Sequence, residues 1–133
     1  MSKPDIHLVD ADDEIERQFR LIMRRLAGGV CIITAGLGED ITGMTVTSLT
    51  SLSAAPPRLL VSINRQASSF APIARHRLFG VNILGSDQQV LAERFSNGRL
   101  TGRERFEGID WSHGSSGVPL LSRSLAMVEC QVE

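Results

Sequence analysis

Residues 41–57 read ITGMTVTSLTSLSAAPP, a run of seventeen residues without a charge that ends in two prolines. From Thr45 to Ser53, six of nine side chains carry a hydroxyl. A strand that only covers a core alternates large apolar side chains with polar ones, and this run does not. We therefore interpret 41–52 as one long strand that lines a binding site, broken after it by AAPP because proline cannot donate into a sheet.

The hydroxyls of such a strand would lie on both of its faces. Thr45 and Thr47 would share one side, and Ser48 and Thr50 the other. Gly43 would place no bulk beside them. Small neutral donors and acceptors of this kind favour a flat, polar, uncharged ligand.

Length and composition indicate an ordinary globular domain. The chain has 133 residues, 42% of them hydrophobic and 22% charged, with a formal net charge of −1. We expect one domain over 1–133 with a disordered tail over 1–11. The charge balance gives no reason to expect nucleic-acid binding, and no segment is apolar enough for a signal or a membrane span, so we predict a cytoplasmic protein.

The remaining elements alternate between strands and short helices, which favours an antiparallel barrel over a doubly wound sheet. A capping-box pattern at Ser86 and Gln89 predicts the start of the second short helix. The expected elements are a helix from Asp12 to Gly28, strands over 30–35, 58–64 and 78–84, short helices over 70–76 and 86–97, a long loop over 98–119 and a last strand over 125–133.

Two polar features bear on binding. Ser68 and Ser69 precede the first short helix, where free backbone N–H groups favour an anion, and Arg65 is close in sequence. The alternative is that one serine only caps the helix. Cys31 and Cys130 stand in apolar settings without metal-ligand spacing, so we predict neither a metal site nor a disulfide.

Five blocks of the sequence together resemble one known family. They are LAGGVCIITAG, GMTVTSLTSLSAAPPRLLVSINRQASS, FGVNILGSDQQVLAERFS, RFEGIDW and GVPLLSRSLAMVECQV, in this order over residues 16–133. They resemble the flavin reductase-like family, the reductase components of two-component flavin-dependent monooxygenases. The resemblance implies a mainly β fold, namely an antiparallel Greek-key split β-barrel with a few short flanking helices. It also implies that the protein works as a homodimer. It also implies hydride transfer from NADH or NADPH to FMN or FAD, and a separate monooxygenase that uses the reduced flavin.

The resemblance also implies a set of cofactor-binding residues. The GMTVTS block would line the flavin ring and ribityl chain, and the block after the third strand would hold the phosphate. Phe95 looks like a residue near the cofactor, although an aromatic side chain at helical spacing can equally belong to the core. The implied residues are Met44, Thr45, Val46, Thr47, Ser48, Asn64, Arg65, Ser68, Ser69 and Phe95.

No catalytic side chain is predicted. Hydride transfer takes place between the two cofactors, and the protein binds and orients them. His76 lies in a charged stretch and His113 in a glycine-rich one, so we assign neither a catalytic role.

The sequence departs from the family pattern at its C-terminal end. Family members continue for a few dozen residues past the block that ends here at Glu133, with further strands and a segment near the nicotinamide. We therefore expect a C-terminally truncated domain, which puts reductase activity in doubt more than flavin binding. Two alternatives stay open: a flavin-binding barrel without reductase activity, acting as a carrier or sensor, and a binding domain without flavin.

Overall fold

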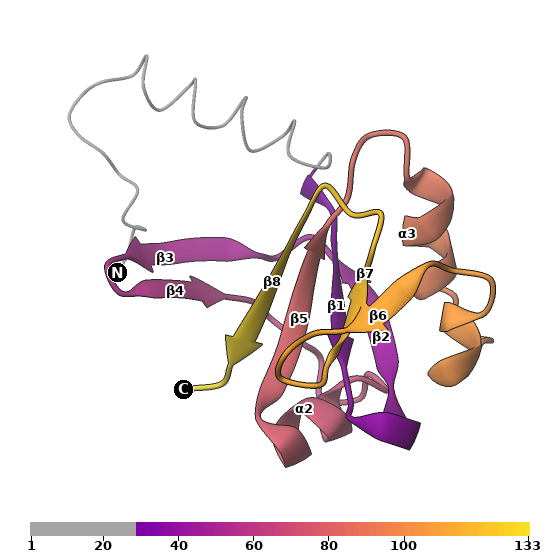
Figure 1. Ribbon diagram of the computed structural model, residues 1–133, viewed down its shortest axis with the longest axis horizontal. Helices are drawn as coiled ribbons and strands as arrows, with labels where there is room; N and C mark the ends of the chain where they lie inside the picture. Colours follow the sequence, from indigo (N-terminus) through magenta and orange to yellow (C-terminus); the bar gives the residue numbers. More distant parts are fainter. Residues whose placement is uncertain (1–28) are drawn as a thin grey trace.

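The computed structural model describes residues 29–133 as a mainly β fold with two α-helices (Figure 1). The predicted tail over 1–11 and the helix from Asp12 lie outside these residues. Within them, no helix combines the length and the apolar character needed to cross a membrane. The elements are β1 (Cys31–Ala35), η2 (Gly38–Asp40), β2 (Thr42–Val46), β3 (Thr50–Ala54), β4 (Pro57–Leu60), α2 (Phe70–His76), β5 (Leu78–Ile83), α3 (Gln89–Phe95), η3 (Arg103–Phe106), β6 (Trp111–His113), β7 (Pro119–Leu121) and β8 (Ala126–Gln131).

A four-stranded antiparallel sheet in the order β2-β1-β5-β8 forms the centre of the fold. Its strand β1 reads CIITA and is buried along its whole length. Because successive side chains point to opposite faces, β1 contributes to both hydrophobic clusters. Ile32 packs with Phe95 and Phe106 on the face towards α3, and Ile33 packs with Ile73 on the face towards α2.

The predicted single strand over 41–52 is wrong, because the chain leaves the sheet after Val46. β2 pairs with β1, whereas β3 pairs only with β4 in a separate two-stranded sheet. Figure 1 shows this hairpin reaching away from the central sheet. At the bend, the Ser48 hydroxyl donates to the Ser62 carbonyl at 3.2 Å and accepts from the Ser62 N–H at 3.1 Å. Ser48 and Ser62 lie opposite each other where the Thr50–Leu60 pairing of the hairpin would continue, and here the Ser48 side chain bonds to both backbone groups of Ser62.

Three other boundaries also differ from the prediction. The third strand ends at Leu60 instead of residue 64, and the predicted loop over 98–119 contains η3, β6 and the start of β7. The capping box at Ser86 does not form. Helix α3 begins after Gln88, whose side-chain oxygen accepts from the Gly85 N–H at 2.7 Å. The strands predicted over 30–35, 78–84 and 125–133 and the helix over 70–76 are confirmed.

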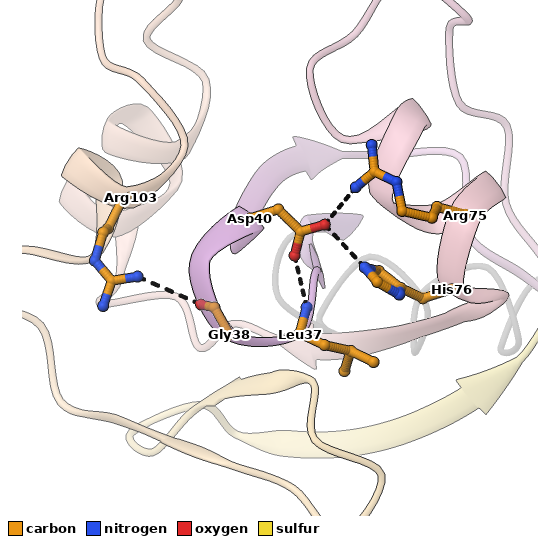
Figure 2. Close-up of polar contacts among 6 residues, drawn as sticks. All are labelled: Leu37, Gly38, Asp40, Arg75, His76 and Arg103. Atoms are coloured by element: carbon orange, nitrogen blue, oxygen red, sulfur yellow. Dashed lines mark hydrogen bonds and ion pairs between the residues drawn. The ribbon is translucent and has the colours of Figure 1, made fainter.

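Asp40 links the β1–β2 connection to the C-terminal end of α2 (Figure 2). Its Oδ2 lies 2.5 Å from Arg75 Nη1 and 2.8 Å from His76 Nε2, and its Oδ1 accepts from the Leu37 N–H at 2.8 Å. Burial alone would raise the pKa of Asp40, but the hydrogen bonds from His76 and Leu37, with the charge of Arg75, hold it below its usual value. The carboxylate fixes α2 at its far end and so helps to place the segment that leads into it.

Glu129 on β8 holds the turn between β6 and β7. Its two carboxylate oxygens accept from the N–H and hydroxyl groups of both Ser115 and Ser116, with distances between 2.6 and 3.3 Å. The hydroxyl and N–H of Ser116 hold the pKa of Glu129 below its usual value. The turn and β8 are therefore tied together most firmly when this side chain is ionised.

We expect the variant Glu129→Gln to remove an acid-sensitive part of the stability. A lowered native pKa means that the carboxylate stabilises the fold above its unfolded-state pKa of about 4.3, and that this contribution is lost as the pH falls through the native pKa. Urea unfolding between about pH 3 and about pH 7 should show the advantage of the wild type over the variant shrinking with acidification. A difference that stays constant over that range contradicts the assignment, and Glu39→Gln in the exposed η2 turn is the control.

Candidate functional site

The guanidinium of Arg105, on η3, joins three segments that are far apart in the sequence. Its side chain is buried, with only 7% of the residue exposed. Nη1 donates to the Ser68 hydroxyl at 3.1 Å, to the Gly43 carbonyl at 3.2 Å and to the Thr42 hydroxyl at 3.4 Å. Nη2 donates to the Asn97 carbonyl at 3.2 Å. The start of β2, the segment before α2 and the chain after α3 therefore meet at one cation.

This cation has no acidic partner within residues 29–133, since each of its acceptors there is a neutral oxygen. Burial lowers the pKa of Arg105, because a desolvated charge is less stable than one in water. A guanidinium stays protonated in proteins, so the charge persists. The guanidinium is therefore a positive centre that forms no ion pair with a carboxylate in the described part of the chain.

Buried polar groups without partners lie in the same part of the molecule. Ser69 is completely buried, and its hydroxyl has no hydrogen-bond partner in the described part of the chain, nor has Nε of Arg105. Ser69 is the N-cap residue of α2 but makes no side-chain cap hydrogen bond. The alternative that Ser69 serves as a capping side chain therefore does not describe this structure. Unsatisfied buried donors are uncommon and call for an explanation, of which a ligand is one.

The hydroxyls of the GMTVTS block have different environments. Thr45 donates to the Ala92 carbonyl at 2.6 Å and so holds α3 against β2. Thr47 is exposed just beyond the end of β2, and Ser48 is exposed and bonded to Ser62 at the bend. Val46 is buried. Of the hydroxyl groups in this block, that of Thr47 is the one with neither burial nor a hydrogen bond within residues 29–133.

The remaining predicted residues also separate by environment. Asn64 accepts the Gln66 N–H at 2.8 Å through its side-chain oxygen, and this turn shapes the approach to Ser68. Arg65 is exposed and Met44 is half-buried beside the cluster around Ile33. These predicted residues thus have three different roles in the structure: Asn64 forms a turn, Met44 packs against the core and Arg65 lies at the surface.

Phe95 belongs to the core of the structure, with 1% of its surface exposed. Its ring packs edge-on against Phe106 at 5.2 Å. A Cβ added at Gly43 would lie 2.9 Å from two carbons of this ring, so the space beside Gly43 is occupied by Phe95. This arrangement agrees with the core alternative for Phe95, and its contact with a cofactor stays a prediction. The unobstructed surface expected at Gly43 is not present.

Comparison with known proteins assigns the fold to a family. The family model for the flavin reductase like domain matches residues 23–133. The chain belongs to the flavin reductase-like family. Its resemblance to this family in five sequence blocks is therefore confirmed along most of its length.

Relatives of this flavin reductase-like chain include proteins named as flavin reductases. It is 34% identical over 129 residues to FMN reductase (NADH) SmoA of Agrobacterium fabrum, covering 96% of this chain and 71% of the relative. It is 34% identical over 117 residues to HsaB, the reductase subunit of a flavin-dependent monooxygenase of Rhodococcus jostii, covering 88% of this chain and 58% of the relative. Among solved structures, the NADH:FAD oxidoreductase SgcE6 of Streptomyces globisporus, in complex with NAD and FAD fragments, is 30% identical with a TM-score of 0.71, over 96% of this chain and 74% of that one.

In this flavin reductase-like fold, β2 connects the two groups of predicted site residues. Thr42, at its first position, lies 3.4 Å from Ser68, and Thr47 follows its last position. Five residues of strand span about 13 Å between the first and last Cα at 3.3 Å per step. The serines and the Thr47 bend thus lie at opposite ends of one strand, as separate binding points for an elongated ligand would.

Sequence reasoning missed Arg105 and its contact with Asn97. Arg105 stands in RERFEG, where charges alternate, and such a stretch is typical of a solvated surface. The available signal was the neighbouring Phe106, an aromatic residue in a charged stretch, which is buried in the core beside Arg105. Hollows lined by Gln88 and Arg123 lie beside α3 and share no residue with the predicted site.

Proposed function

We propose that this protein is an NAD(P)H-dependent flavin reductase that supplies reduced FMN or FAD to a separate monooxygenase. The observation that carries the proposal is the positive centre at Arg105, beside Ser68, whose exposed hydroxyl can donate to an anion, in a chain of the flavin reductase-like family. A flavin phosphate is such an anion, and the donor set fits it. The activities for which SmoA and HsaB are named support the reaction and the partner class.

The protein's part in the reaction is to bind and orient. A flavin held here would supply the redox chemistry, with the hydride coming from NADH or NADPH. Ser68 would donate to its phosphate, with the buried Ser69 directly after it, Asn64 shaping the turn before them and Arg65 adding exposed charge. At the other end of β2, the GMTVTS block offers backbone groups and the Thr47 hydroxyl to the polar edge of the ring.

We further propose a homodimeric, cytoplasmic protein whose strands belong to a Greek-key split barrel. Support for association comes from apolar side chains displayed on strands that lack a covering layer within residues 29–133. Leu52 and Leu60 on the β3–β4 hairpin are 48% and 55% exposed, and Met127 and Val128 on β8 are 44% and 45% exposed. Light scattering on purified protein should give twice the mass of the chain.

A flavin titration followed by a nicotinamide assay tests the function. Trp111 is the only tryptophan of the sequence, and its ring lies 5.2 Å from that of Phe106, next to Arg105. Its fluorescence should fall on addition of FMN or FAD. The same protein should oxidise NADH or NADPH only when flavin is added. Binding without oxidation favours the carrier or sensor alternative, and absence of binding overturns the proposal.

Thr47→Val should weaken flavin binding without changing stability. The exposed Thr47 hydroxyl has no hydrogen bond within residues 29–133, so its loss costs the bond to the flavin, about 0.5–1.5 kcal/mol of binding free energy. Thr45→Val is the matched control, because its hydroxyl bonds to Ala92 and should affect unfolding more than binding. Titration and urea unfolding of both variants measure the two effects. Equal flavin affinity in Thr47→Val and wild type would rule out the contact.

A further inference from the structure

The hydrogen bonds at Arg105 have a direction that matters for an incoming anion. Arg105 Nη1 donates to the Ser68 oxygen at 3.1 Å, the shortest of the hydrogen bonds that this guanidinium makes in the described structure. The serine oxygen therefore acts as an acceptor towards the guanidinium, and its own proton must point elsewhere. The one other contact of this hydroxyl within residues 29–133 is to the Thr42 hydroxyl at 3.4 Å, which is long for an O–H···O bond. The Ser68 proton is thus available to a stronger acceptor.

Arg105 and Ser68 differ in their exposure to solvent, so the charge is buried while the hydroxyl is accessible. Arg105 is buried, whereas Ser68 is exposed. An anion that approaches Ser68 meets a donor polarised by the buried cation behind it. Because the guanidinium has only neutral acceptors within residues 29–133, no carboxylate there has to be displaced.

We propose that Arg105 is a positioning residue for phosphate recognition, holding Ser68 as a donor and supplying a fixed positive charge behind it. The inference rests on the proposed function, since the phosphate is that of FMN or FAD. It assigns a role to η3, a segment that is distant from the serines in sequence and that the residue pattern does not connect with them. The ring end of the flavin is not involved.

Comparison of FMN with riboflavin, which lacks the phosphate, tests this role. In Arg105→Gln the dissociation constant for FMN should rise about 10- to 100-fold, the loss expected for hydrogen bonding to a charged group. The dissociation constant for riboflavin should change much less. A loosened fold would weaken both ligands together, so the ratio of the two constants separates positioning from structural support.

Two further variants keep the test decisive if Arg105→Gln folds poorly. Ser68→Ala removes an exposed hydroxyl and its bond from Arg105 but leaves the three other acceptors of Arg105 in place, so it should lower FMN affinity with riboflavin affinity unchanged. Arg94→Gln is the matched control, because Arg94 bonds to the carbonyls of Glu104 and Arg105 and supports η3 without contacting Ser68. It should leave the ratio of FMN to riboflavin affinity at the wild-type value.

The possible outcomes separate the two proposals. If the wild type binds neither flavin, both the proposed function and this inference fail. If the wild type binds both flavins and Ser68→Ala keeps the wild-type ratio, only the role of Arg105 and Ser68 fails. The KM values for NADPH and NADH give a further outcome. If Arg105→Gln or Ser68→Ala changes the KM for NADPH but not for NADH and leaves FMN affinity unchanged, the phosphate bound here is that of NADPH, and the inference is overturned.

Discussion

Replacement of Asn82 by leucine is expected to destabilise the protein by about 2–4 kcal/mol, because a completely buried amide loses three hydrogen bonds at once. Nδ2 of Asn82 donates to the Ile32 carbonyl at 2.9 Å and to the Thr34 hydroxyl at 3.0 Å, and Oδ1 accepts from the Leu121 N–H at 2.8 Å. Leucine has a similar size but leaves the Leu121 N–H without an acceptor in the interior. Urea unfolding monitored by circular dichroism measures the loss.

An exposed asparagine provides the control for this effect. Asn97 accepts one side-chain hydrogen bond, from the Arg99 N–H at 2.9 Å, in an exposed turn. Asn97→Ala should cost about 1 kcal/mol or less, because water replaces the lost partner. If Asn82→Leu were as stable as this control, the amide would not be what joins β7 to the central sheet.

Phe95→Ala is expected to cost about 3–5 kcal/mol of unfolding free energy, since it removes a ring that is 1% exposed and packed edge-on against Phe106. Gly43→Ala should cost about 1–3 kcal/mol for the opposite reason, because its added methyl group would lie 2.9 Å from the ring. In the double variant the methyl group enters the space that the ring has left. The second substitution should therefore cost clearly less in the Phe95→Ala background than in the wild type.

The double-mutant cycle distinguishes packing from independent effects. Coupling between residues in contact is about 0.5–3 kcal/mol, whereas distant sites add within about 0.3–0.5 kcal/mol. Strictly additive free energies would show that Gly43 and Phe95 do not share this space. The cycle also bears on the cofactor, because a phenylalanine needed for packing with Gly43 should affect stability more than flavin affinity.

Periodicity predicted the elements whose partners are local or whose burial is complete. The apolar run VCIIT predicts β1, and the stretch from Phe70 to His76 predicts α2 with the observed bounds. The end of β2 was not predictable in the same way. Nothing in Thr47 to Leu49 signals a break, and β2 ends because its partner β1 begins at Cys31, which pairs with Val46. Ser48 instead bonds to the backbone of Ser62, fourteen residues later.

The part of the site that depends on local sequence pattern was predicted, and the part that depends on distant contacts was not. Ser68 and Ser69 stand in a recognisable block before a helix, and Thr47 stands in another. Arg105 stands in RERFEG and reads as a surface residue, because its burial depends on how η3 packs against β2. Ser68 and Arg105 are 37 positions apart, so a short stretch of sequence does not show that they are in contact.

The sequence by itself determined the family, the mainly β character and the identity of the hydroxyl and serine blocks, because these follow from local pattern and from order along the chain. The tertiary structure alone decided that β2 and β3 belong to different sheets, that Phe95 fills the space at Gly43 and that a buried arginine stands behind Ser68. Each of these depends on contacts between segments that are distant in sequence, and such contacts form only when the chain closes around one core.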